Sequence, residues 1–239
     1  MRGKQVVRAN TTNDSRFRAP LYTIPEAAYY LRRAPTTLGN WVHGGGETAP
    51  LVSSTPSPIR RQAEIPFIGL AEALVVAFLR RKGISMGKIR RALEELAKEM
   101  TLEHALASRR LHTDGVGVFF RYAQAADDGE IGYMAEVIQQ QYVLDGIIDE
   151  GLTIVSFSDD GWAGRLVLPF GDRELIEVNP KRGFGKPRFV HGGAPMMSVL
   201  DRLEAKEPIK SVARDFDVPA EDIEELLLAF IQKPSATAS

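Results

Sequence analysis

The sequence predicts an α+β protein in three parts: an N-terminal winged helix-turn-helix, a small central antiparallel sheet, and a C-terminal helical unit patterned like a second helix-turn-helix. Residues 22–43 hold two helical patterns separated by a proline, residues 151–180 alternate in polarity between Gly/Asp turns, and residues 196–231 return to helical spacing. The chain has 239 residues and 44% hydrophobic content, enough for one large core or two modest ones. The expected parts are a flexible arm (1–20), a winged domain (21–110), a dimerisation or partner-binding domain (111–231) and a disordered tail (232–239).

The first helical pair carries specific start and stop signals. Thr23 and Glu26 form a capping box, in which a hydroxyl and a carboxylate three residues apart satisfy the first backbone amides of a helix. Pro35 ends that helix, because proline lacks an amide donor and disfavours helical geometry in the preceding residue. A second short helix follows, with Leu38 and Trp41 on its inner face. Such a second helix enters the major groove in helix-turn-helix proteins, whereas an ordinary helical hairpin is the alternative.

Charge divides the chain into two unlike halves. Residues 1–110 carry 18 Lys and Arg against 9 Asp and Glu, a net charge of +9. Residues 111–239 carry 12 against 22, a net charge of −10. This asymmetry predicts that the first half meets a polyanion and the second meets something else. The alternative is that the two halves neutralise each other within the fold.

Composition excludes several classes of protein. The chain has no cysteine, which excludes disulfides, thiol catalysis and cysteine-ligated metal. No apolar run approaches the roughly 20 residues that a membrane-spanning helix needs. The polar N-terminus does not read as a secretory signal. We therefore expect a cytoplasmic protein with no membrane partner.

The basic half continues beyond the helical pair as a loose wing and two further helices. The wing spans residues 44–66, which are rich in Pro, Ser and Gly, and it carries Arg60 and Arg61. A broad apolar stripe in residues 68–83 predicts a helix that stops at a basic last turn and a glycine. Residues 86–100 predict the next helix, followed by a short one near residues 101–110. The arm supplies further cations for phosphate: Arg2, Lys4, Arg8, Arg16 and Arg18.

Two arginine pairs flank the helical pair. Arg32-Arg33 ends the first helix and Arg60-Arg61 lies on the wing, where both pairs are able to grip backbone phosphates. The residues of the second helix expected to reach base edges are Thr36, Thr37, Asn40 and His43. Asparagine suits adenine, because its amide pairs with one donor and one acceptor. A solvated helix end or loop explains either arginine pair equally well when it is taken alone. What favours phosphate binding is that both arginine pairs lie around the same two helices.

The acidic half predicts strands followed by helices. A strand is expected near residues 111–122, while residues 132–148 fit either a helix or a strand pair. The helix expected near residues 219–230 displays acidic side chains that phosphates would repel, which disfavours a role in reading DNA. Its apolar residues spread over more than one face, which favours a dimer or partner contact through Ile223, Leu226, Leu227 and Phe230.

Catalytic and metal-binding patterns are weak. The four histidines are scattered and no two lie at i and i+4, so we expect no metal site and no cofactor. Asp127-Asp128 and Asp159-Asp160 adjoin glycines, which favours solvated turns over paired catalytic carboxylates. Residues 183–187 read GFGKP, but no hydroxyl follows the lysine as a phosphate loop requires, so a hairpin turn is expected. The sequence therefore predicts no enzyme.

Two segments resemble known families. TIPEAAYYLRRAPTTLGNWV, then a hairpin and AEALVVAFLRRKGISMGKIRRALEEL, is similar to the winged-helix head of MerR-like proteins. NPKRGFGKPRFVHGGAP, followed by VLDRLEAKEPIKSVARDFDVPAEDIEELLLAF, resembles a small bacterial domain common in VapB-type antitoxins. Two departures stand out: Gly39 replaces an arginine usual in the head, and Lys206-Glu207-Pro208 replaces a Gly-Glu-Ser turn.

The resemblance implies a type II antitoxin that binds its own operator and masks a PIN-domain ribonuclease toxin, as a homodimer within a larger assembly. Such nucleases bind metal in a carboxylate cluster, which an inhibitor would meet with basic or aromatic side chains. The candidates are Trp162, Arg165, Arg173 and the hairpin residues Lys186 and Arg188. The alternative is a MerR-like transcription regulator whose C-terminal domain senses a ligand or dimerises. A metal-dependent nuclease acting alone is a third class.

Overall fold

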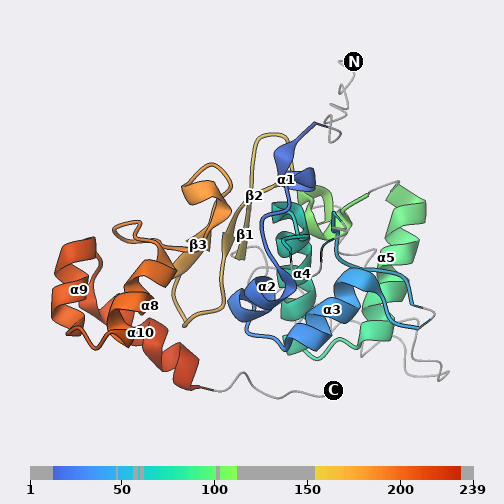
Figure 1. The fold of residues 1–239 in the computed structure, drawn as a ribbon. Helices are drawn as coiled ribbons and strands as arrows, with labels where there is room; N and C mark the ends of the chain where they lie inside the picture. The colour runs from blue at the N-terminus through green and yellow to red at the C-terminus, as the bar shows by residue number, and fades with distance from the viewer. Residues whose placement is uncertain are drawn as a thin grey trace, which may run out of the picture.

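The computed structural model describes residues 13–46, 48–55, 59, 62–100, 103–111 and 154–232 (Figure 1). The strand expected near 111–122 and the segment 132–148 fall, apart from Leu111, outside these residues. In the N-terminal half the elements are α1 (Ser15–Arg18), α2 (Ile24–Tyr30), α3 (Pro35–His43), α4 (Phe67–Arg81), α5 (Met86–Met100) and the 3₁₀ turn η1 (Ala105–Ala107). In the C-terminal half they are β1 (Val155–Phe157), β2 (Ala163–Val167), β3 (Ile176–Val178), the 3₁₀ turn η3 (Gly183–Gly185), β4 (Arg188–Phe189), α8 (Met196–Glu204), α9 (Ile209–Phe216) and α10 (Ala220–Ile231).

The helical pair forms as its local signals predict. The Thr23 hydroxyl accepts a hydrogen bond from the Glu26 amide at 3.2 Å, and the Glu26 carboxylate accepts one from the Thr23 amide at 2.9 Å. Helix α2 ends at Tyr30, and Pro35 occupies the first turn of α3. Both sequence signals, the capping box and the proline stop, are confirmed.

Helix α4 is the centre of the N-terminal half. Every residue from Phe67 to Leu79 is buried, because α1, α5, η1 and strand β2 pack around it. The helix ends at Arg81 and is followed by Lys82 and by Gly83, whose backbone is left-handed, as the basic last turn and the glycine predict. The described residues of the wing form no strand ladder, and Leu51 and Val52 instead donate their amides to one carbonyl, that of Trp41, at 2.8 and 3.0 Å.

The central sheet is the antiparallel meander that the alternating segments predict. Its four strands lie in the order β1-β2-β3-β4. Leu166 pairs with Val178, and Ile176 pairs with Phe189 on the next strand. All four side chains are fully buried. The sheet lies between the N-terminal helices and the α8–α10 unit (Figure 1).

The two halves share a single hydrophobic core, which includes Phe17 from the segment expected to be a flexible arm. The expectation of a flexible arm through residue 20 is wrong for its last part, because Ser15–Arg18 form α1. Phe17 is only 7% exposed and meets the rings of His104 and Trp162 edge-on, at 5.1 and 5.2 Å. Burial of this one aromatic side chain fixes α1 against the body of the protein.

Helix α10 presents a different apolar surface from the one expected. Ile223 and Leu226 are fully buried in the chain's own core, which removes them from any surface that a partner contacts. Leu227 and Phe230 are partly buried against the same core. The exposed apolar side chains of this helix are Leu228 and Ile231, at 56% and 77%. No helix among the described residues is long and apolar enough to span a membrane.

Candidate nucleic-acid interface

Helix α3 turns a row of polar side chains to solvent. Its apolar side chains are buried, which fixes the rotation of the helix: Leu38, Trp41 and Val42. The exposed residues Thr36, Asn40 and His43 follow each other at spacings of four and three, so they lie on one face. Thr37 is partly exposed beside them. The structure thus brings the four predicted base-reading residues onto one helix with a defined outer face.

His43, at the end of this row, is held by a carboxylate. Its Nε2 lies 2.7 Å from Oε2 of Glu64. The backbone of Glu64 is anchored in turn, because its amide donates to the carbonyl of Tyr22 at 3.0 Å. The contact orients the imidazole, and it places a negative charge at the C-terminal end of α3. Phosphate contacts are therefore better accommodated at the other end of the row.

Arg32 and Arg33 form one cluster with two arginines from the end of α4. The Arg33 guanidinium donates to the carbonyl of Ala77 at 2.9 Å, and that of Arg32 donates to the carbonyl of Gln232. Burial lowers the pKa of Arg33, and the neighbouring Arg80 lowers it further. Burial also lowers the pKa of Arg81, together with the charges of Arg33 and Arg32. The four positive charges therefore act on one another and add to a positive potential at this end of α4.

The arginine cluster (Arg32, Arg33, Arg80 and Arg81) is larger than the pair that sequence reasoning selected. A guanidinium has five N–H donors, so one bond to a carbonyl leaves Arg33 further donors for phosphate. The basic last turn of α4 was visible in the sequence, but its approach to Arg33 depends on tertiary packing. Arg60 and Arg61, the second predicted pair, lie outside the described residues.

Two predicted partner-binding arginines are paired with carboxylates of their own chain. The Nη2 atom of Arg165 contacts Glu174 at 2.8 Å, and its Nε donates to Glu177 at 2.5 Å. Arg173 donates to Glu225 at 2.9 Å. A groove of about 980 Å³ separates this acidic region from the arginine cluster. Its basic residues are Arg32, Arg81, Lys82 and Arg173, and its acidic residues are Asp172, Glu174 and Glu225.

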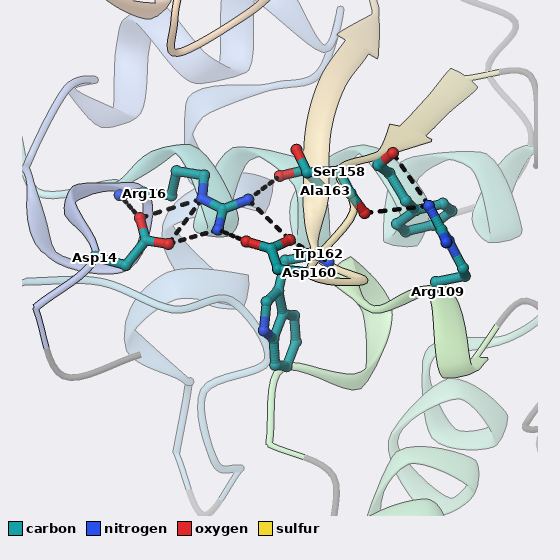
Figure 2. Close-up of polar contacts among 8 residues, drawn as sticks. Asp14, Arg16, Arg109, Ser158, Asp160, Trp162 and Ala163 are labelled. Atoms are coloured by element: carbon teal, nitrogen blue, oxygen red, sulfur yellow. Dashed lines mark hydrogen bonds and ion pairs between the residues drawn. The ribbon is translucent and has the colours of Figure 1, made fainter. Parts of the chain in front are cut away.

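Trp162 and Arg16 take part in a clamp between α1 and the β1–β2 turn (Figure 2). The Arg16 guanidinium lies between the carboxylates of Asp14 and Asp160 and donates to the carbonyl of Ala163 at 3.3 Å. Asp160 also accepts the backbone amide of Trp162 at 3.0 Å. Burial would raise the pKa of Asp160, but the bonds from Arg16 hold it below its usual range. Asp160 is thus an ion-pair partner within a turn, and Arg16 is committed to the fold.

Of the remaining predicted partner residues, Lys186 lies on the β3–β4 connection and Arg188 is the first residue of β4. The Lys186 ammonium contacts Glu26 of α2 at 3.2 Å. Arg188 donates its Nε to the carbonyl of Gly193 at 2.5 Å. Lys186 therefore ties the β3–β4 connection to the helix-turn-helix, and Arg188 supports the turn that follows β4.

One polar cluster has the composition of a catalytic triad but not its geometry. The Nδ1 atom of His104 lies 2.8 Å from the Ser53 hydroxyl and 3.0 Å from Glu72. Serine and carboxylate meet the same ring nitrogen, whereas a proton relay needs one on each nitrogen. The hydrogen bond to Glu72 raises the pKa of His104. Among the residues that the structure describes, no group of three His, Asp or Glu side chains forms a metal site.

Comparison with known proteins finds two segments of the chain in known families, and a relative and a solved structure that each match 89% of the chain. Residues 20–93 match a family described as "Putative DNA-binding HTH domain", and residues 176–228 match "Protein of unknown function (DUF433)". A Mycobacterium tuberculosis protein named "Putative antitoxin VapB45" is 34% identical over 227 residues, covering 89% of this chain and 94% of that protein. The X-ray crystal structure of Rv2018 from Mycobacterium tuberculosis covers 89% of this chain and 99% of its own at 34% identity, with a TM-score of 0.71.

Proposed function

This chain belongs to the VapB45-type antitoxin family. We propose that it is a non-catalytic antitoxin with two binding activities. It binds operator DNA of its own operon through α3, and it neutralises a PIN-domain ribonuclease by direct contact. The observation that carries the DNA role is the exposed row Thr36, Asn40 and His43 on a helix whose other face is buried. A homodimer and a cytoplasmic location complete the proposal as predictions.

Electrostatics supports α3 over α10 as the DNA-reading helix. The arginine cluster begins at the turn that joins α2 to α3, where it attracts phosphate. Helix α10 instead exposes Glu221 and Glu224 on its outer face. A helix with that face would repel the backbone of a duplex. The C-terminal unit is therefore the part we assign to protein contacts.

Fluorescence anisotropy with DNA from upstream of the chain's own reading frame tests the DNA role. Asn40→Ala is expected to relax discrimination at one base pair by about 5- to 150-fold, because a bidentate amide contact contributes about 1–3 kcal/mol. Glu224→Gln on α10 is the matched control and is expected to leave binding unchanged. Equal discrimination by wild type and Asn40→Ala would refute base reading by this helix.

Co-expression with the product of the neighbouring reading frame, which we expect to be a PIN-type nuclease, tests the toxin role. The nuclease is expected to co-purify with the chain, and the chain is expected to rescue growth. The groove of about 980 Å³ gives the alternative, a ligand-sensing regulator, a place where a small molecule would bind. The ligand-sensing regulator would be the better explanation if the chain purifies alone and a metabolite changes its affinity for the operator. RNA cleavage by the chain alone, abolished by a chelator, would indicate the third class.

A further inference from the structure

The β3–β4 connection displays an aromatic side chain on strained backbone. Gly183, Phe184 and Gly185 have φ angles of 56°, 52° and 74°, three successive residues in the left-handed region. Glycine adopts that region easily, whereas a residue with a β-carbon is strained there. Phe184 is nonetheless 88% exposed, more than any other large hydrophobic side chain in the described part of the chain. Folding alone gives no reason for an exposed phenylalanine at a position that suits glycine.

The loop is held rigidly beneath Phe184. The buried Tyr22 hydroxyl donates to the carbonyl of Gly185 at 2.6 Å. Lys186 contacts Glu26 at 3.2 Å on the outer side of the same junction. Within the loop, the amide of Lys186 donates to the carbonyl of Gly183 at 3.0 Å. The ring therefore projects from a fixed base, so that binding through it costs little ordering of the loop.

The charges around Phe184 favour a protein partner over a nucleic acid. Residues 181–188 contain four cations and no carboxylate. The loop therefore complements an acidic surface. However, Lys186 is paired with Glu26, and Arg182 lies 4.0 Å from Glu177. Those carboxylates reduce the positive charge of the loop, which disfavours a grip on the dense charge of a phosphate backbone more than contact with a few carboxylates. A single protruding aromatic ring suits an apolar pocket on a protein.

We infer that Phe184 is an anchor that inserts into an apolar pocket, bordered by carboxylates, on the protein partner of this chain. This inference rests on the proposed antitoxin function, because the partner is taken to be the toxin. It differs from the sequence-based prediction, which selected the cations of this hairpin. In this inference the cations of the hairpin contact the carboxylates at the border of the pocket, and Phe184 provides the contact that is buried inside it.

Calorimetric titration of the full chain with the purified nuclease from the neighbouring reading frame tests the anchor. Phe184→Ala is expected to weaken binding by at least about 30-fold, the effect typical of a central interface residue. Phe184→Gly is expected to weaken binding likewise while raising the Tm, because glycine relieves the strained backbone. Ile59→Ala, at a 58% exposed position in the wing, is the matched control and is expected to bind as wild type does.

The outcomes separate this inference from the proposed function. If wild type and Phe184→Ala bind the nuclease equally, the anchor is refuted and the antitoxin role stands. If wild type does not bind the nuclease, both are refuted. If Phe184→Ala weakens binding to operator DNA and leaves nuclease binding unchanged, the loop is a nucleic-acid contact and the anchor is refuted. The Tm of each variant shows that it is folded.

Discussion

Replacing Tyr22 with phenylalanine removes one hydroxyl group that joins the helix-turn-helix to the β3–β4 connection. The hydroxyl donates to the Gly185 carbonyl at 2.6 Å, and Tyr22 has no exposed surface. Burial raises the pKa of Tyr22 well above its usual range, so the group remains a donor at every working pH. A neutral hydrogen bond contributes about 0.5–1.5 kcal/mol, and a buried carbonyl left without a donor costs about 1–3 kcal/mol. We therefore expect the free energy of unfolding to fall by about 2 kcal/mol.

Urea denaturation followed by circular dichroism measures this loss directly. The midpoint is expected to fall with an unchanged m-value, and the Tm is expected to fall by about 4–8 °C for a chain of this size. Tyr29→Phe is the matched control, because the Tyr29 side chain is 42% exposed whereas Tyr22 has no exposed surface. Equal stability of the Tyr22→Phe and Tyr29→Phe variants would refute the assignment of Tyr22 as the link between the two halves.

Three further predictions concern pH, packing and DNA affinity. Because Glu72 raises the pKa of His104 in the folded state, the His104–Glu72 bond stabilises the protein below the ordinary imidazole pKa of about 6.5. That contribution is lost as the pH rises through the raised value, so urea midpoints at pH 6 and pH 8.5 should differ more for wild type than for His104→Asn. Gly69→Ala should cost about 1–3 kcal/mol, because the new methyl group would lie 2.2 Å from the carbonyl of Ser53. Gly39→Ala should instead gain up to about 1 kcal/mol, because Gly39 lies inside α3 and the new methyl group would meet Ile24 at an ordinary contact distance of 4.0 Å. Thermal melts that rank the two variants the other way would contradict both packing arguments. Gly39→Arg should strengthen operator binding, and the plot of log affinity against log salt concentration should become steeper by about 0.9, the change expected for one added phosphate contact. An unchanged slope would place this face of α3 away from the DNA backbone.

Local signals in the sequence predicted local structure well. The capping box at Thr23 and Glu26 and the stop at Pro35 act over three or four residues, so their effect does not depend on the rest of the fold. The meander was predictable for a similar reason, because alternation and Gly/Asp turns define each strand and its neighbour. The resemblance to VapB-type antitoxins was carried by such contiguous motifs, and a relative over most of the chain confirms it.

Long-range pairing could not be read from the sequence. Phe17, which the sequence places in a flexible arm, is instead part of the core only because His104 and Trp162, distant in the chain, provide the rings that cover it. Helical spacing likewise showed that α10 is apolar on several sides, but it did not show which side the core would take, and Ile223 and Leu226 are buried. Exposed hydrophobic side chains are visible only once the core is known.

The role of the DNA-reading and partner-binding residues remains a prediction, since each depends on a molecule outside the chain. Sequence reasoning treated Arg32 and Arg33 as independent cations near a helix end. The structure shows that Arg80 and Arg81 belong to the same cluster. It also shows that Arg32 and Arg33 each donate one hydrogen bond to a backbone carbonyl. Phe184 was passed over because a phenylalanine between two glycines reads as a turn.

The most direct test of the central claim is a titration of ribonuclease activity. A PIN-type nuclease, which we expect the neighbouring reading frame to encode, is held at fixed concentration with a fluorescent RNA substrate, and the purified chain is added stepwise. If the chain is an antitoxin, cleavage falls to background at a fixed molar ratio of chain to nuclease, and the fall persists when the substrate concentration is raised. Undiminished cleavage in the presence of excess folded chain would contradict the account.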